Sequence, residues 1–159
     1  MIRLSAVGDV VRTLPALTCL RRAYPSAHIA WAVEEPSREL LEDQPDLDET
    51  LIFPRRKLSR ALLHPSEVGQ AKAALSAFMG SLKDARFDLV IDFQGTMKSA
   101  MMARLSGAPR RIGFARKHGR EMSHLLYSER VSLLRPSMSR VERALALVAH
   151  LGVDVGNAT

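Results

Sequence analysis

The chain has 159 residues, 47% of them hydrophobic, and a formal net charge of +6, which provides one α/β core but not two ordinary domains. It has no apolar run of about 18 residues and no secretory signal at its first residues, so we expect a cytoplasmic protein. Its one cysteine, Cys19, excludes an internal disulfide and a thiolate metal cluster, and its apolar neighbours predict a core position.

Predicted strands and helices alternate along the chain. In order, we expect a strand ending at 2–4, a helix over 13–24, a strand over 28–33, a helix over 37–43 and a strand over 50–53. There follow an arginine-rich connection over 54–63 that could include a helical turn, a helix over 66–82 and a strand over 87–93. The last elements are a helix over 96–105, a strand over 111–114, a basic irregular segment over 115–123 and a helix over 137–151. This alternation predicts a Rossmann-like parallel sheet with helices on both faces.

Acidic and basic residues are segregated along the sequence. Residues 34–49 are acidic, whereas two basic clusters contain no acidic residue: Arg55, Arg56, Lys57 and Arg60, and then Arg110, Arg111, Arg116, Lys117 and Arg120. Each cluster is either a solvated face or a site for an anion such as phosphate, a carboxylated sugar, nucleic acid or a membrane surface. Aromatic residues make up only 5% of the chain and show no base-stacking pattern, so we expect no nucleic acid partner.

Asp9 follows the first predicted strand and is expected on a short loop after which a helix begins. One interpretation is a turn residue that accepts backbone N–H bonds, and the other is a general base that takes a proton from an attacking hydroxyl. Ligands gather beyond the carboxyl ends of parallel strands. We therefore expect one crevice to be faced by Asp9 and by the residues that follow the other strands: Glu34, Glu35, Arg55, Arg56, Asp92, Gln94 and Lys98.

Several motifs in a fixed order resemble one known family. They are residues 3–11 (RLSAVGDVV) with 13–17 (TLPAL), 31–35 (WAVEE), 88–100 (DLVIDFQGTMKSA), 111–114 (RIGF), 119–121 (GRE) and 126–127 (LY). Together they resemble the amino-terminal half of the lipopolysaccharide heptosyltransferase I family, inverting glycosyltransferases of family 9 with the two-domain GT-B fold. The resemblance implies that residues 1–152 form an acceptor-binding domain and that 153–159 begin an interdomain segment. It also implies that the carboxyl-terminal donor-binding domain is absent.

The resemblance also implies a reaction and roles for particular residues. In the family, heptose passes from ADP-heptose to Kdo of Kdo-lipid A at the cytoplasmic face of the inner membrane, and Asp9 falls at the position of the general base. The family's basic acceptor-binding positions match or lie near Arg55, Arg56, Arg60 and Arg120, of which Arg120 aligns most securely. Gln94 and Lys98 belong with Asp92 to an internal motif, for which acceptor binding and a structural role both remain open.

No metal or other cofactor is expected. Asp46-Leu47-Asp48 resembles a metal-binding motif, but it follows Pro45 in an acidic segment and is interpreted as a solvated loop. The histidines show no ligand spacing. ADP-heptose is expected to bind mainly the absent domain, so we expect the chain alone to be inactive. The alternative function is a non-catalytic basic α/β module that binds an anionic glycolipid, a membrane surface or nucleic acid.

Overall fold

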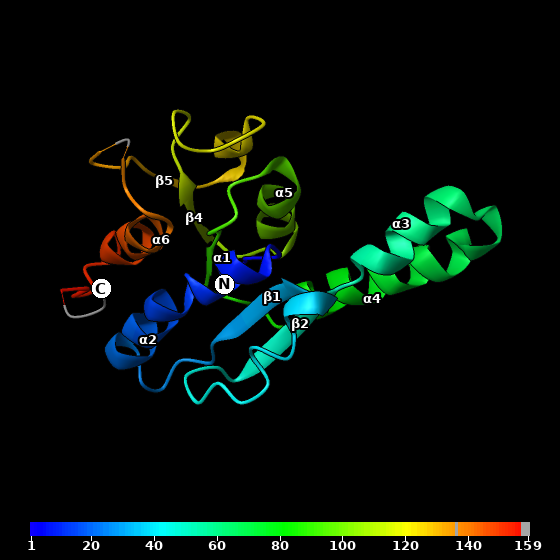
Figure 1. Ribbon diagram of the computed structural model, residues 1–159, viewed down its shortest axis with the longest axis horizontal. Coiled ribbons are helices and arrows are strands. Elements are labelled where there is room, and N and C mark those ends of the chain that lie inside the picture. The colour runs from blue at the N-terminus through cyan, green and yellow to red at the C-terminus, as the bar shows by residue number, and fades with distance from the viewer. Residues whose placement is uncertain (136, 157–159) are drawn as a thin grey trace.

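The computed structural model describes residues 1–135 and 137–156 (Figure 1). Its strands are β1 (Ala30–Glu34), β2 (Glu49–Phe53), β3 (Leu89–Ile91), β4 (Arg110–Phe114) and β5 (Glu129–Val131). Its α-helices are α1 (Val7–Val11), α2 (Leu14–Ala23), α3 (Arg55–Leu63), α4 (Val68–Asp84), α5 (Met97–Leu105) and α6 (Arg140–Ala149). Short 3-10 helices are η1 (Glu35–Ser37), η2 (Pro65–Glu67) and η3 (Ser123–Leu126). Of the expected interdomain segment, residues 157–159 lie outside the described residues.

Residues 1–4 join two groups of parallel strands into one sheet. β1 pairs with β2, and β3, β4 and β5 pair in sequence order. Ile2 bridges Ala32 of β1 on one side and Asp92, directly after β3, on the other. The strand order is therefore β2, β1, residues 1–4, β3, β4, β5, and the expectation of a Rossmann-like parallel sheet is confirmed. The strand order reverses between residues 1–4 and β3, which is where α/β sheets of this kind bind ligands.

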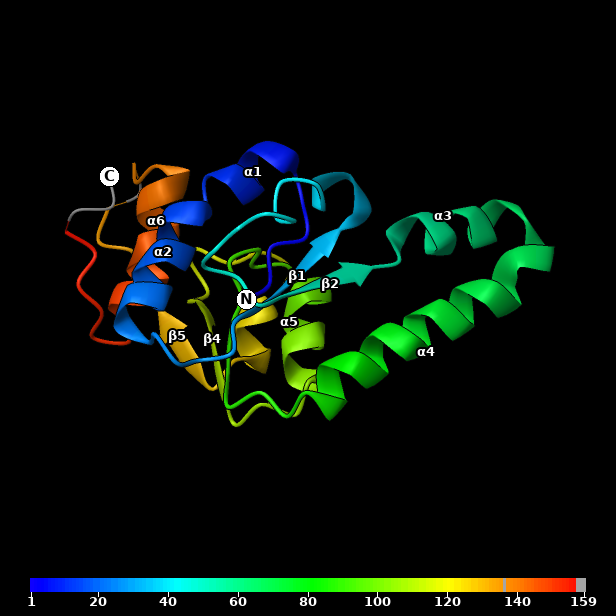
Figure 2. The same cartoon turned by 90° about the horizontal axis from the view of Figure 1, so that it is seen from below.

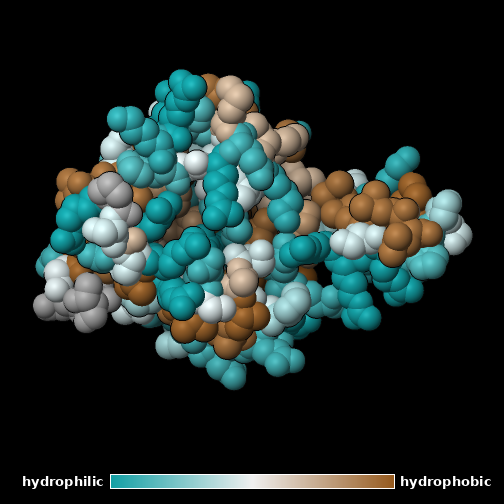
Figure 3. Space-filling model, turned by 45° about the horizontal axis from the view of Figure 1, so that its top comes forward, coloured by the Kyte–Doolittle hydropathy of each residue, from teal (hydrophilic) through white to brown (hydrophobic). Residues whose placement is uncertain are grey.

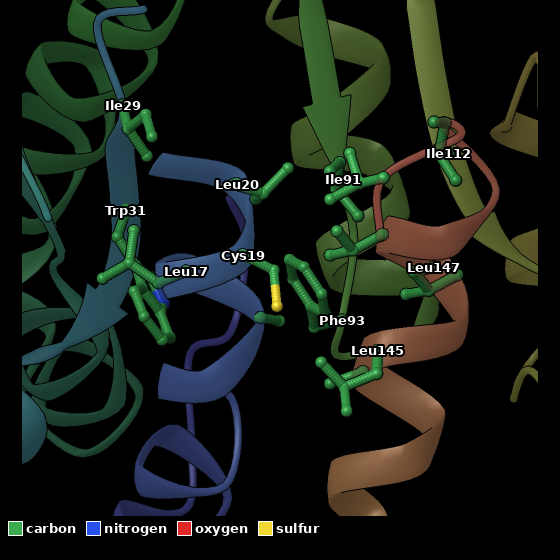
Figure 4. Packing of buried hydrophobic residues seen from close by; sticks show 14 of the residues in the cluster. Leu17, Cys19, Leu20, Ile29, Trp31, Ile91, Phe93, Ile112, Leu145 and Leu147 are labelled. Atoms are coloured by element: carbon green, nitrogen blue, oxygen red, sulfur yellow. The ribbon is translucent and has the colours of Figure 1, made fainter. Parts of the chain in front are cut away.

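Apolar residues cover both faces of this sheet. On one face, α2 and α6 pack against it: Cys19 and Leu145 point towards Phe93, and Leu17 lies beside Trp31, in one cluster of buried side chains (Figure 4). On the other face, α4 and α5 contribute a second cluster that includes Phe78 and Leu82, Met102 and Ala103. Cys19 is fully buried, as expected, and the helix expected over 66–82 packs into the second cluster through the apolar residues in the second half of α4.

One local expectation is wrong, and two segments are more regular than expected. Residues 37–43 form η1 and turns rather than a helix, because the bonds here run from Leu41 N to the Arg38 carbonyl and from Gln44 N to the Leu41 carbonyl, each spanning three residues. β5 was not expected, since it is short, carries Glu129 and Arg130, and buries only Val131. The arginine-rich connection over 54–63 contains a complete helix, α3.

Helices α3 and α4 form a hairpin that projects away from the sheet (Figures 1 and 2). The hairpin is attached to the body by an edge-to-face contact between the rings of Phe53 and Phe78, with centroids 5.4 Å apart. Leu58 of α3 and Leu75 of α4 are partly buried against the same cluster. Because α3 itself buries no residue, the outer part of the hairpin lies outside the hydrophobic core. Among the described residues, no helix is both long enough and apolar enough to cross a bilayer.

Candidate functional site

A cavity of about 550 Å³ opens at the carboxyl edge of the sheet, where the strand order reverses. Its polar lining comes from residues 1–4 and α1, from the turn after β3, from the loop after β4 and from the first turn of α6: Arg3, Asp9, Thr13, Gln94, Thr96, Lys117, His118, Arg120, Ser139, Arg140 and Arg143. Segments far apart in sequence meet here because parallel strands all end at the same edge.

Asp9 lies in the first turn of α1 rather than on a loop, which corrects the expectation from the sequence. The Thr13 hydroxyl donates to the Asp9 carbonyl over 2.8 Å and thereby fixes the end of this turn. The Asp9 carboxylate forms an ion pair with the Arg3 guanidinium, and its Oδ1 lies 3.5 Å from Arg12 Nη1 and 3.9 Å from Arg140 Nε. It does not cap α1, and its side chain is 20% exposed, so it remains accessible from the cavity.

The cavity has an excess of positive charge. Arg120, Arg140 and Arg143 all line it, with Asp9 as the carboxylate among them. Burial lowers the pKa of Arg143, and repulsion from Arg140 and Arg120 lowers it further. Arg143 is held in place because its Nη2 donates to the His118 carbonyl over 2.9 Å and its guanidinium lies 5.1 Å from the ring centre of Phe114. Cations held close together in this way favour an anionic ligand that would relieve their repulsion.

Gly95 anchors the loop that carries Arg120. The Arg120 backbone N–H donates to the Gly95 carbonyl over 2.8 Å, and the Ser123 hydroxyl donates to the same oxygen over 3.1 Å. Gly95 has φ of +71°, and a Cβ there would lie 3.0 Å from the Phe114 ring, so glycine is needed for both conformation and space. Gln94 also lines the cavity, and its Oε1 accepts a bond from the Leu4 backbone N–H over 3.2 Å.

Asp92 lies inside the fold rather than in the cavity. It is fully buried and accepts bonds from the backbone N–H groups of Gln94 and Gly95, at 2.8 and 3.1 Å, and from the Tyr127 hydroxyl at 2.6 Å. Burial raises the pKa of Asp92 and these hydrogen bonds oppose the rise, while burial and the nearby carboxylate raise the pKa of Tyr127. The geometry therefore favours the structural interpretation of Asp92.

Tyr127→Phe is expected to lower the free energy of unfolding by about 1–3 kcal/mol, because the buried Asp92 loses a donor. Since the folded pKa of Asp92 lies above its unfolded value, the wild-type chain loses stability as pH rises through the window between them. The hydroxyl stabilises the ionised form, so the effect of the substitution should be larger at neutral pH than at acid pH. Urea denaturation at both pH values measures this difference, and an equal loss at both would contradict it.

The other predicted site residues do not join this cavity, so the expectation of one shared crevice is wrong. A second cavity of about 470 Å³ is lined by Glu34, Glu35, Pro36, Arg55, Arg56 and Ser59. Glu34 is buried, and its carboxylate oxygens lie 2.8 Å from Arg55 Nη1 and 3.1 Å from Lys98 Nζ. The Lys98 Nζ also lies 4.9 Å from the ring centre of Phe53. Glu34 therefore pairs with two of the cations that the sequence offered for an anion and offsets one of their two positive charges.

Two further groups lie outside both cavities. Arg60 is on the projecting hairpin, where its Nη2 lies 3.0 Å from Glu67 Oε1. In the acidic segment, Asp46 accepts a bond from the Thr18 hydroxyl over 2.8 Å, and Asp48 accepts one from the Ile29 backbone N–H over 2.6 Å. The Asp46 and Asp48 carboxylates are therefore not only solvated, because they hydrogen-bond the loop over 45–48 to α2 and to Ile29, directly before β1. Over residues 1–135 and 137–156, no three potential metal ligands come together.

Arg140 and Arg143 were missed as site residues, although the sequence contains a signal for them. Ser139 and Glu142 form a capping box: Ser139 N donates to Glu142 Oε2 over 2.6 Å and Glu142 N donates to Ser139 Oγ over 3.2 Å. This pattern fixes the helix start at Arg140, whereas the apolar periodicity suggested residue 137. With the correct start, Arg140 and Arg143 share one face of the first turn.

Comparison with known proteins agrees with this architecture. Residues 75–159 match the model of glycosyltransferase family 9 (heptosyltransferase). Lipopolysaccharide heptosyltransferase 1 of Pseudomonas aeruginosa is 32% identical over 150 residues, which cover 94% of this chain and 41% of that protein. Escherichia coli heptosyltransferase WaaC with ADP superposes with a TM-score of 0.85 at 29% identity, over 98% of this chain and 48% of that one. The same enzyme with ADP-2-deoxy-2-fluoro heptose gives a TM-score of 0.84.

The chain spans less than half the length of the relatives and structures just described. Its fold corresponds to the Rossmann-like amino-terminal portion of WaaC, a GT-B glycosyltransferase. The family model covers more than half of the chain, from within α4 through the loop that carries Arg120 and on through α6. The chain therefore belongs to glycosyltransferase family 9, the heptosyltransferases.

Proposed function

We propose that this chain is the acceptor-binding half of an inverting heptosyltransferase that transfers heptose from ADP-heptose to Kdo of Kdo-lipid A, in the inner core of lipopolysaccharide. The observation that carries the proposal is one accessible carboxylate, Asp9, in a cavity at the switch point of the sheet whose other charged side chains are arginine and lysine. The choice of donor class is supported by the similar WaaC structures, which are of that enzyme with ADP and with ADP-2-deoxy-2-fluoro heptose.

In the proposed reaction, Asp9 acts as the general base. Its carboxylate accepts the proton of an acceptor hydroxyl while that oxygen forms a bond to the anomeric carbon of the heptose and ADP leaves with the electron pair of the broken bond. Attack from the face opposite ADP inverts the anomeric centre. Arg3 fixes the orientation of the carboxylate, and Arg120 and Arg143 bind carboxylate or phosphate groups of the acceptor.

ADP-heptose is proposed to bind mainly a second domain of the same polypeptide, because this chain spans less than half of its relatives. The acceptor is anchored in a bilayer, so we propose that the protein acts as a peripheral protein at the cytoplasmic face of the inner membrane. The roles of Arg55, Arg56, Arg60, Gln94 and Lys98 in acceptor binding remain predictions, and no metal or cofactor is required by the reaction as written.

The test is a transfer assay with ADP-heptose and Kdo-lipid A. A protein that joins this chain to a donor-binding half is expected to turn over, and the 159-residue chain alone is not, because one domain cannot orient both substrates for attack. Release of ADP is measured together with the mass of the acceptor product. Robust turnover by the chain alone, or strict preference of the joined protein for another nucleotide sugar, would overturn the assignment.

Acceptor binding can be measured on the chain itself. Arg120→Ala and Arg143→Ala are each expected to weaken binding of Kdo-lipid A by about tenfold to a hundredfold, since each removes charge-assisted hydrogen bonds to an anion. The salt dependence of binding should fall with them. Arg38→Ala is the matched control, because Arg38 is an exposed arginine paired with Glu42 outside the cavity. Equal affinity of all three variants would show that this cavity does not bind the acceptor.

A further inference from the structure

The tip of the α3–α4 hairpin exposes large apolar side chains. Leu62 and Leu63, the last residues of α3, are 87% and 77% exposed. Figure 3 shows brown side chains gathered on this projecting part of the molecule, with teal ones beside them. The following residues, His64 and Pro65, are also exposed. Leu62 and Leu63 are not packed in the hydrophobic core and so do not stabilise it, and their exposure side by side at the end of a protrusion indicates a contact surface.

The same helix is basic at its other end. Arg55, Arg56 and Lys57 occupy the first turn of α3, and the helix contains no acidic residue. Arg55 pairs with Glu34, whereas in the part of the chain that the structure describes Arg56 and Lys57 have no ion pair. The leucines lie more than one turn further out along α3 than these charges. Cations at the base of the hairpin and leucines at its tip follow the order of a bilayer surface, with anionic headgroups outside hydrocarbon.

The hairpin leaves the body at the edge where the candidate site lies. β2 ends at Phe53, and α3 begins two residues later, so the hairpin starts at the carboxyl ends of the parallel strands. Asp9 follows residues 1–4 at that edge, and the second cavity, lined by Arg55 and Arg56, lies at the base of the hairpin. A surface that contacts the tip therefore brings its headgroups towards the same edge as Asp9.

We propose that the hairpin tip docks this chain on an anionic lipid surface, with Leu62 and Leu63 entering the boundary between headgroups and acyl chains and with Arg56 and Lys57 contacting lipid phosphates. The proposal rests on the proposed function, since it explains how a lipid-anchored acceptor is brought to a site on a protein without a membrane-spanning helix among its described residues. A lipid surface is chosen over a protein partner for two reasons. The positive charge at the base of α3 complements anionic headgroups, and the exposed leucines of the hairpin lie together at its projecting tip.

The test is co-sedimentation of the 159-residue chain with vesicles of phosphatidylethanolamine and phosphatidylglycerol, and with vesicles of phosphatidylcholine alone. The wild-type chain is expected to bind the anionic vesicles, and the double variant Leu62→Asp/Leu63→Asp is expected to lose about tenfold or more of its partition coefficient. Leu134→Asp is the matched control, because Leu134 is 92% exposed and lies outside the hairpin. All these side chains are exposed, so circular dichroism should show the same fold.

Two further variants separate the contributions. Leu62→Trp is expected to retain binding, because tryptophan is favoured at the bilayer interface. Arg56→Ala/Lys57→Ala is expected to reduce binding to anionic vesicles by about tenfold and to have no effect with phosphatidylcholine. These vesicles contain no lipopolysaccharide precursor, so their outcome is independent of the transfer assay and of acceptor binding in the cavity.

Three results would overturn the proposal. The first is a wild-type chain that stays in solution with both kinds of vesicle. The second is a Leu62→Asp/Leu63→Asp variant that sediments as well as wild type, which would leave only electrostatic adhesion. The third is a change from dimer to monomer in that variant, seen by light scattering without lipid, which would assign the tip to contact with a second copy.

Discussion

Asp9→Asn is expected to lower kcat of the two-domain transferase by about 10²–10⁴-fold, with little change in acceptor affinity. The amide keeps the size and one acceptor oxygen of the carboxylate but cannot take a proton from the attacking hydroxyl. Acceptor affinity is expected to be retained because the side chains proposed to bind the acceptor, Arg120 and Arg143, are unchanged in the variant. The measurement is steady-state transfer with the acceptor varied, alongside direct binding of the acceptor to the variant.

Asp43→Asn is the matched control for this experiment, since Asp43 is an exposed carboxylate outside the cavity. The Arg3 side chain is only 8% exposed and loses the charge of its partner in Asp9→Asn, so the variant should also unfold at lower denaturant concentration. Activity must therefore be measured where both proteins are folded. An unchanged kcat with a raised KM would make Asp9 a binding residue, and absence of any Asp9-dependent reaction would favour the non-catalytic module.

Gly113→Ala is expected to destabilise the chain by about 2–5 kcal/mol, the largest effect on folding that we expect from adding a single methyl group. A Cβ at position 113 would lie 2.3 Å from Tyr127 Cε2 and 2.4 Å from its Cζ, well inside contact distance. The Tyr127 ring cannot move away without cost, because its hydroxyl is hydrogen-bonded to the buried Asp92 carboxylate over 2.6 Å. The substitution therefore either strains β4 or breaks the hydrogen bond of a buried carboxylate.

Gly80→Ala is the control for Gly113→Ala. Gly80 lies in α4 with no atom within 4 Å of an added Cβ, so alanine there is expected to raise the free energy of unfolding by about 0.5–1 kcal/mol. A double variant tests the mechanism: in the Tyr127→Phe background the hydrogen bond to Asp92 is already lost, so Gly113→Ala should cost about 1 kcal/mol less than in wild type. Strict additivity would mean that strain in β4, and not the hydrogen bond, causes the loss.

Local pattern was sufficient for the elements with strong periodicity. The helix over 66–82, the strand over 87–93 and the helix that starts at Thr96 all reflect interactions between residues close in sequence, and the structure confirms them as α4, β3 and α5. The prediction of a helix over 37–43 failed because the only strongly buried apolar side chain in this segment is Leu41, and one such side chain cannot stabilise an amphipathic helix. β5 was not predicted because the formation of an edge strand of three residues depends on pairing with its partner, β4, more than on its own composition.

The sequence by itself determined the fold class, the family resemblance and the position of Asp9 after the first strand, because these depend on residue order and on short-range pattern. Only the tertiary structure decided which charges are available to a ligand. Lys98 and Arg55 are cationic residues of the types that bind anions, but both contact the buried Glu34. Arg140 and Arg143, in contrast, reach the cavity from a helix far along the chain. Whether a cation is neutralised depends on which distant carboxylate the fold places beside it, and Coulomb energy depends on distance in space rather than along the chain.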